Sequence, residues 1–168
     1  MDRSAIYDTD ILEWSEQQAS ALRGLARTRH DLPNELDLEH VAEEIEDVGR
    51  SEFLAVQSLL RQILIHLVKA VSASDALSML HWRKEVVGFH GDLLDRITPS
   101  MRSRLDLSKL WQQAAKPAEA DLAMRGESVT PGLPSQCPLT IAEIIDPEFD
   151  FLQAVERARE QIKSVHPE

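Results

Sequence analysis

Apolar residues recur every three or four positions between Asp37 and Val71, a spacing typical of one face of an α-helix. With about 1.5 Å of rise per residue, an unbroken helix over this segment is about 50 Å long, enough to span a small domain. The pattern therefore predicts a long central helix, over about residues 37–71, with Asp37 as its cap. The positions expected to face the core are Leu38, Val41, Ile45, Val48, Ala55, Leu59 and Ile63.

Helical spacing continues on both sides of the central helix, and caps or prolines mark where each shorter helix starts. In the first helix, preceded by a cap among Asp8, Thr9 and Asp10, we expect a buried stripe of Ile11, Trp14, Leu22 and Leu25. A third helix is predicted from about Asp75. A fourth helical region runs from Pro99 toward Arg125, with a break near Asp106 left open, and at Pro117 we expect a kinked helix or two abutting ones. The last helix is expected to start at Asp146-Pro147.

The segments between these helices carry turn signals, and no segment shows the alternation of a strand. His30–Leu36 and Gly126–Pro138 are predicted connections, and Thr140-Ile-Ala-Glu143 has the form of a capping box. The sequence therefore predicts an all-α fold: a single-domain helical bundle, residues 1–168, of five to seven helices around the central helix.

Composition describes an acidic globular protein. The chain has 168 residues, of which 43% are hydrophobic and 28% charged, as in ordinary soluble domains. Eighteen basic and twenty-nine acidic residues give a net charge of -11. A surface of this charge repels phosphates and anionic lipids, so we expect no binding of nucleic acid or of a membrane surface. It suits a basic protein partner, a cation site or simply solubility, which is the commonest reason for such a charge.

Cysteine content and hydropathy both indicate a cytoplasmic protein. Cys137 is the single cysteine, so an intrachain disulfide is excluded, and with no cationic neighbour in sequence it is expected to be structural. The first residues lack the charged and then apolar run of a secretion signal. Polar residues interrupt the longest apolar stretch, near Ile63, so no membrane span is expected.

Short motifs along the chain resemble a known family. They are, in order, YDTD followed by a tryptophan (Tyr7–Trp14), AEEIEDVGRSE (Ala42–Glu52), HLVK (His66–Lys69) and CPLTIAEIID (Cys137–Asp146). Together they resemble the bacterial family called domain of unknown function twenty-nine, over about residues 7–149. The resemblance implies a small helical bacterial protein and carries no agreed activity, ligand or catalytic residue. Leu139 departs from the aromatic residue usual there, and the helix over about 147–164 is predicted to be a C-terminal extension.

Three polar side chains of the central helix are candidate site residues because of where the apolar pattern places them. Glu44 flanks the stripe, Glu52 lies within it, and His66 projects from its centre. Burying an unpaired polar group costs about 1–3 kcal/mol, so each of them needs a partner. The structural explanation is a hydrogen bond to a tryptophan N–H, a backbone group or an arginine of another helix. The partners on offer are Trp14, Asp8 and Asp10 of the first helix and His81, Trp82 and His90 of the third.

The functional alternative for these residues is a metal site in the bundle core. Helical di-metal proteins take a Glu-x-x-His pair from each of two helices, and this chain contains no such pair. Glycine-rich phosphate loops and serine-nucleophile motifs are also missing from the sequence. No cofactor is therefore predicted, and a divalent metal at Glu44, Glu52 and His66 stays as the alternative.

Two function hypotheses remain open. The first is a non-enzymatic protein-interaction or regulatory helical module that binds another protein or a second copy of itself. It is motivated by the missing catalytic motifs and by basic residues after the acidic central helix, which could be its electrostatic counterpart within the molecule or across a dimer. The second is a metal-dependent enzyme, resembling a hydrolase, that uses the three candidate residues.

Overall fold

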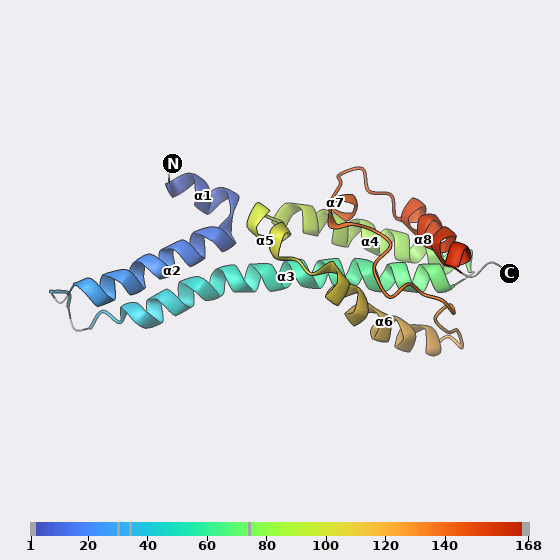
Figure 1. Cartoon of the computed structure of the whole chain (residues 1–168), viewed down its shortest axis with the longest axis horizontal. Coiled ribbons are helices and arrows are strands. Elements are labelled where there is room, and N and C mark those ends of the chain that lie inside the picture. Colours follow the sequence, from blue (N-terminus) through green and yellow to red (C-terminus); the bar gives the residue numbers. More distant parts are fainter. Residues whose placement is uncertain (1–2, 30, 34, 74, 166–168) are drawn as a thin grey trace. The chain divides into compact units, whose positions relative to one another are not determined.

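The computed structural model describes residues 3–29, 31–33, 35–73 and 75–165, and Figure 1 shows their path. These residues form eight helices and no strand, so the predicted all-α class is confirmed, with one helix more than expected. His30 and Asn34 of the predicted connection His30–Leu36 lie outside the described residues, and so does Ser74. The helices are α1 (Arg3–Thr9), α2 (Ile11–Thr28), α3 (Leu38–Ser72), α4 (Ala76–Arg96), α5 (Pro99–Arg104), α6 (Leu107–Ala123), α7 (Ile141–Ile144) and α8 (Phe151–Val165).

The predicted long central helix is α3, and it is continuous through Gly49. Asp37 caps it, since its Oδ1 accepts a hydrogen bond from the backbone N–H of His40 at 3.2 Å. The chain forms two compact units, and α3 contributes to both. The hairpin unit runs up to Val56 and includes Arg96–Arg104, and the bundle unit comprises Gln57–Asp95 and the chain from Leu105 onward.

In the hairpin unit, Asp10 both starts α2 and attaches α5 to it. Its side chain caps α2 by accepting from the backbone N–H of Glu13. It also accepts hydrogen bonds from the Thr98 hydroxyl at 2.8 Å and the Ser100 hydroxyl at 2.6 Å. Burial raises the pKa of Asp10, but these hydrogen bonds outweigh it and leave the pKa below its usual value. The predicted cap is confirmed, and the short α1 before it was missed.

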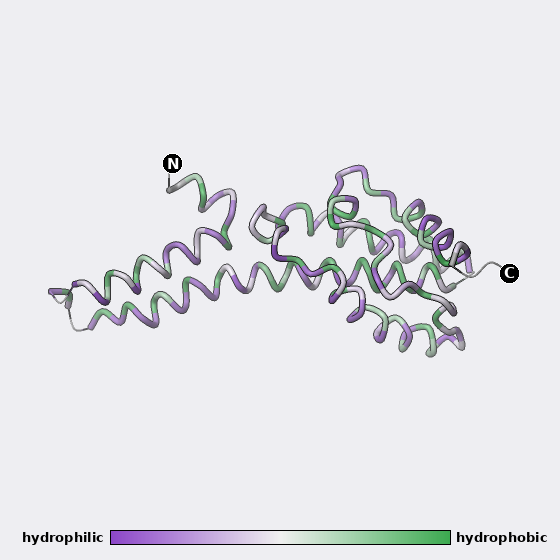
Figure 2. The backbone as a smooth tube through the Cα atoms, in the orientation of Figure 1, coloured by the Kyte–Doolittle hydropathy of each residue, from purple (hydrophilic) through white to green (hydrophobic). Residues whose placement is uncertain are grey.

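In the bundle unit, the end of α3 is buried all round. Every residue from Ile63 to Val71 is buried, which is the pattern of a helix surrounded by others. Figure 1 shows α4 and α6 alongside this part of α3, and Figure 2 shows its run of apolar positions in green. The helically spaced Leu110, Trp111, Ala114, Ala118 and Leu122 of α6 are buried, and Leu107 at its start is half-buried. Of the two alternatives at Pro117, two abutting helices are wrong, because α6 continues through this exposed residue. The kinked helix stays a prediction.

The connection after α6 is held by side chains of other elements. Gly126 ends the helix with φ of 74°, a conformation that favours glycine. Trp111 Nε1 donates to the carbonyl of Pro134 at 2.8 Å, and the N–H of Thr130 donates to the Ser72 hydroxyl at 3.0 Å. These bonds fix the long Gly126–Pro138 connection against α6 and the end of α3.

Thr140 and Glu143 form the predicted capping box at the start of α7. The predicted start of the last helix is wrong. Asp146 instead accepts from the N–H of Glu148 in a turn, and Asp150 accepts from the N–H of Leu152 at 2.8 Å. Since Asp150 supplies the cap, α8 begins at Phe151 rather than at Pro147.

The capping box gives a testable pH dependence. Hydrogen bonds from the Thr140 backbone and from Arg157 lower the pKa of Glu143 to about 2. Because the pKa of Glu143 is lower in the folded than in the unfolded protein, its ionised form stabilises the fold at pH values above the usual carboxyl pKa. This stabilisation is lost as the pH falls toward 2. Glu143→Gln is therefore expected to lower the urea midpoint at neutral pH, with a difference from the unaltered protein that shrinks at low pH. A difference that is constant with pH would contradict this.

By length and composition, α3 is apolar enough to cross a membrane, with mean hydropathy 1.4 over an 18-residue window. Of that window, 61% is buried inside the protein. Such burial is typical of the core helix of a bundle, which passes the same hydropathy test. The expectation that the chain has no membrane span stays a prediction.

Candidate functional site

Small residues form the seam between α2 and the first half of α3. Gly49 is buried there, and a Cβ built on it would lie 2.0 Å from the Ser15 hydroxyl and 3.1 Å from Cα of Leu12. Ser15, Ala19 and Ala42 are fully buried in this unit. Glycine at position 49 therefore lets the two backbones approach closely, and the helices meet through small side chains.

Most of the larger apolar side chains of the hairpin lie outside this seam, although Leu12 of α2 lies in it and is 4% exposed. Val41 is 41% exposed and Val48 is 48% exposed, so the prediction that they face the core is wrong. Ile45 is half-buried. The expected buried stripe of α2 is wrong in the same way: its members are only half-buried, namely Ile11, Trp14, Leu22 and Leu25. In both helices the seam is displaced from the large residues toward the small ones.

These side chains share one side of the hairpin. Successive helix residues turn by ~100°, so Ile45 and Val48 lie on one side of Gly49 and Glu46 lies on the other. Arg23 of α2 pairs with Glu46 at 2.7 Å, which marks that second side. Figure 1 shows α2 running back along α3. We call the first side, made of Leu22, Leu25, Val41, Ile45 and Val48, the open face.

Acidic side chains border the open face along α3. Glu44 is exposed and takes part in no ion pair among the described residues. Asp37 lies near the hairpin turn, and hydrogen bonds from His40 lower its pKa below the usual value. On the same helix Glu43 and Asp47 are also exposed. The open face is thus apolar with an acidic edge.

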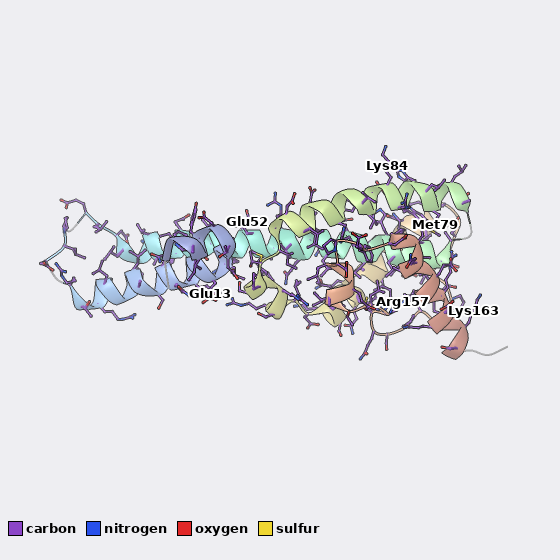
Figure 3. All side chains as sticks on the ribbon, turned by 90° about the horizontal axis from the view of Figure 1, so that it is seen from above. Glu13, Glu52, Met79, Lys84, Arg157 and Lys163 are labelled. Carbon is purple, nitrogen blue, oxygen red and sulfur yellow. The ribbon has the colours of Figure 1, made fainter. Side chains whose placement is uncertain are left out.

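The sequence-predicted candidates Glu44, Glu52 and His66 take separate positions along α3. Glu44 is exposed, and Glu52, labelled in Figure 3, accepts from Arg96 at 2.9 Å within the hairpin unit. His66 is buried in the bundle unit and has partners of its own there. Among the described residues, no three histidine, cysteine, aspartate or glutamate side chains are grouped as metal ligands. The metal alternative stays a prediction.

His66 is held between two acceptors in the bundle unit. Its Nδ1 lies 2.8 Å from the carbonyl of Gln62, and its Nε2 lies 2.8 Å from a carboxylate oxygen of Glu85 on α4. A carbonyl and an ionised carboxylate only accept, so both bonds form when both ring nitrogens carry a hydrogen. His81 lies 3.5 Å from the same Glu85 oxygen. His66 therefore connects α3 to α4.

A second ion pair connects α3 to α6 beside His66. Lys69 is buried, and its Nζ donates to Asp121 at 3.0 Å. The same Nζ lies 5.1 Å from the centre of the Trp82 ring. The Arg125 guanidinium lies 5.2 Å from the centre of this ring. Both distances suit cation–π attraction. These groups line an open groove of about 540 Å³, in which each buried base already has an acidic partner.

Among the described residues that line this groove there is no serine, threonine or cysteine. Cys137 lines a different pocket, and burial raises the pKa of its thiol to about 11, which agrees with a structural role. The pairing of His66 and Lys69 with carboxylates on two other helices explains why polar side chains are tolerated in this core. Sequence reasoning missed Glu85 and Asp121, because charged residues on exposed helix faces give no signal of a cross-helix partner.

Comparisons with known proteins agree with the motifs. Residues 6–150 match the family described as Domain of unknown function DUF29, and this match ends just before α8. A solved structure, an alpha-helical protein of unknown function from Rhodospirillum rubrum, is similar with a TM-score of 0.85 and 45% sequence identity. The alignment covers 90% of this chain and 96% of that one. No curated protein matches. The predicted resemblance is confirmed, and this chain belongs to the DUF29 family.

Proposed function

We propose that this protein is a non-enzymatic protein-interaction module whose open face binds a basic amphipathic helix. One observation carries the proposal: Val41 and Val48, two turns apart on the same face of α3, are 41% and 48% exposed. Water contact with apolar surface is unfavourable by about 25 cal/mol per Å², so covering this face stabilises a complex. A third helix that packs against both α2 and α3 is the simplest way to bury the open face of a helical hairpin.

The acidic edge of the open face favours a partner with positive charge. Glu44 and its acidic neighbours attract lysine and arginine, and the net charge of -11 steers basic partners toward the whole protein. Two open faces brought together would place like charges side by side. A helix with an apolar face and basic edges therefore fits better than a second hairpin.

The proposal is tested with two short synthetic amphipathic helices that share one leucine face. One carries lysines on its polar face and the other carries glutamates. Fluorescence anisotropy is expected to detect binding of the lysine peptide, weakened by salt and by Glu44→Lys. Val48→Glu is expected to raise Kd about tenfold or more, which corresponds to about 1.4 kcal/mol.

Leu54→Glu is the matched control for Val48→Glu. Leu54 is also an exposed apolar residue of α3, at 56%, but lies about 120° around the helix from Val48. This variant is expected to bind the lysine peptide as the unaltered protein does. Equal weakening by both substitutions, or equal binding of the two peptides, would contradict the proposal.

A further inference from the structure

A second exposed apolar stripe runs along α4 in the bundle unit. Leu77 is 77% exposed, Leu80 is 59% exposed and Val87 is 60% exposed, although each is a large apolar residue. Lys84 lies between Leu80 and Val87 on the same side of the helix, and Figure 3 shows it pointing away from α4. Arg83 is exposed beside it. The stripe is thus apolar with a basic centre.

Two glycines leave this side of α4 without side chains. A Cβ added to Gly88 or Gly91 would meet nothing within 4 Å, so neither glycine is needed for packing inside the chain. Each costs about 1 kcal/mol relative to alanine in a helix interior. Glycines on an exposed face permit another helix to approach closely, and they extend the stripe past Val87.

The α4 stripe has the chemistry that the open face requires. Its lysine and arginine are opposite in sign to Glu44 and Asp47, and both surfaces present large aliphatic side chains. Their spacing also matches. Val41 and Val48 are seven residues apart, as are Leu80 and Val87, so each pair spans two helical turns, or about 10.5 Å.

An antiparallel arrangement brings the charges into register. If Leu80 lies against Val48 and Val87 against Val41, then Lys84 falls opposite Glu44, four residues along in each helix. One alignment of the two helices therefore forms both apolar contacts and the ion pair at the same time. We propose that the open face of one copy of this protein binds the α4 stripe of a second copy. This inference rests on the proposed function, for which it names the partner.

The test is a charge exchange read by light scattering after size-exclusion chromatography. The unaltered protein is expected to have the mass of two or more copies of the 18.9 kDa chain, because each copy offers both surfaces, and this mass is expected to fall toward that of one copy on dilution. Glu44→Lys and Lys84→Glu are each expected to weaken self-association about tenfold or more, and the double variant to regain most of it. Both residues are exposed, so circular dichroism should show unchanged helicity. Leu54→Glu serves again as the control.

Three outcomes would overturn the inference. The first is a protein that stays monomeric at all concentrations, and the second is two single variants that associate as the unaltered protein does. The third is a double variant in which the two charge substitutions compensate each other although the protein is monomeric. The lysine peptide separates this inference from the proposed function. If a monomeric protein binds that peptide in a way that depends on Val48, the open face still binds a basic helix, and the partner is another protein. If neither association nor peptide binding occurs, both proposals fail.

Discussion

Gly49→Ala is expected to lower the free energy of unfolding by up to about 2 kcal/mol, because overpacking a close contact costs about 1–3 kcal/mol. The added methyl would lie 2.0 Å from the Ser15 hydroxyl and 3.1 Å from the Leu12 backbone. Alanine favours helices by about 1 kcal/mol over glycine, so the observed loss is what remains after this gain. Urea unfolding followed by circular dichroism measures it.

Gly88→Ala is the control for Gly49→Ala because the same change is made in a helix where the methyl meets nothing. It is expected to stabilise the protein by up to about 1 kcal/mol. Adding Ser15→Ala to Gly49→Ala removes the nearest clashing atom and should recover part of the loss. Stabilisation by both glycine substitutions would show that the seam between α2 and α3 is looser than described.

His66→Ala is expected to cost about 2–3 kcal/mol, the second large effect. The substitution removes a buried ring that packs 5.7 Å from the Phe89 ring, centre to centre. It also leaves the Gln62 carbonyl without its side-chain donor and Glu85 without its buried partner. The cavity and the lost hydrogen bonds both contribute to this cost. Thermal and urea unfolding of the variant measure it.

His81→Ala tests whether the cost at position 66 comes from burial. His81 also faces Glu85, at 3.5 Å, but its side chain is 62% exposed. Exposed ion pairs contribute little, so this variant is expected to remain within about 0.5 kcal/mol of the unaltered protein. Similar losses in the two variants, or no loss in His66→Ala, would contradict the description of His66 as the buried link between α3 and α4.

Much of the fold could be predicted because local signals and tertiary packing agree. Asp10, Asp37 and Thr140 cap helices where their positions before apolar runs indicated. The large apolar residues of α6 are buried as their spacing predicted. In these elements the helix starts at a side chain that satisfies its free N–H groups, and one apolar face meets the rest of the unit.

The hairpin shows where the same reasoning fails. An apolar stripe indicates which face of a helix avoids water, but not whether the chain itself supplies the cover. In α3 the stripe through Val41 and Val48 was assigned to the core, whereas the contact with α2 is made by Ala42 and Gly49. Small residues contribute little to hydropathy, so a sequence pattern gives them no weight, although they permit the closest approach.

The candidate site residues were predicted in part for the same reason. His66 was expected to find a partner on the first helix or at His81, Trp82 or His90 of the third. It is buried as one alternative required, but its side-chain partner is Glu85, a residue of the third helix that was not among those expected. Glu52 was expected on a buried face, yet its carboxylate is paired with Arg96 and is 40% exposed. The partner of a side chain depends on how two helices are aligned along their length, which the periodicity of one helix does not contain.

The most direct test of the account is a methyl NMR titration of the isotope-labelled protein with the lysine peptide. Binding at the open face predicts shifts of the Val41, Ile45 and Val48 methyl groups, joined by those of Leu22 and Leu25 on α2. The Leu54 methyl groups, elsewhere on α3, are predicted to stay unchanged. Shifts confined to other parts of the protein, or equal shifts at Val48 and Leu54, would contradict the claim that the open face is the binding surface.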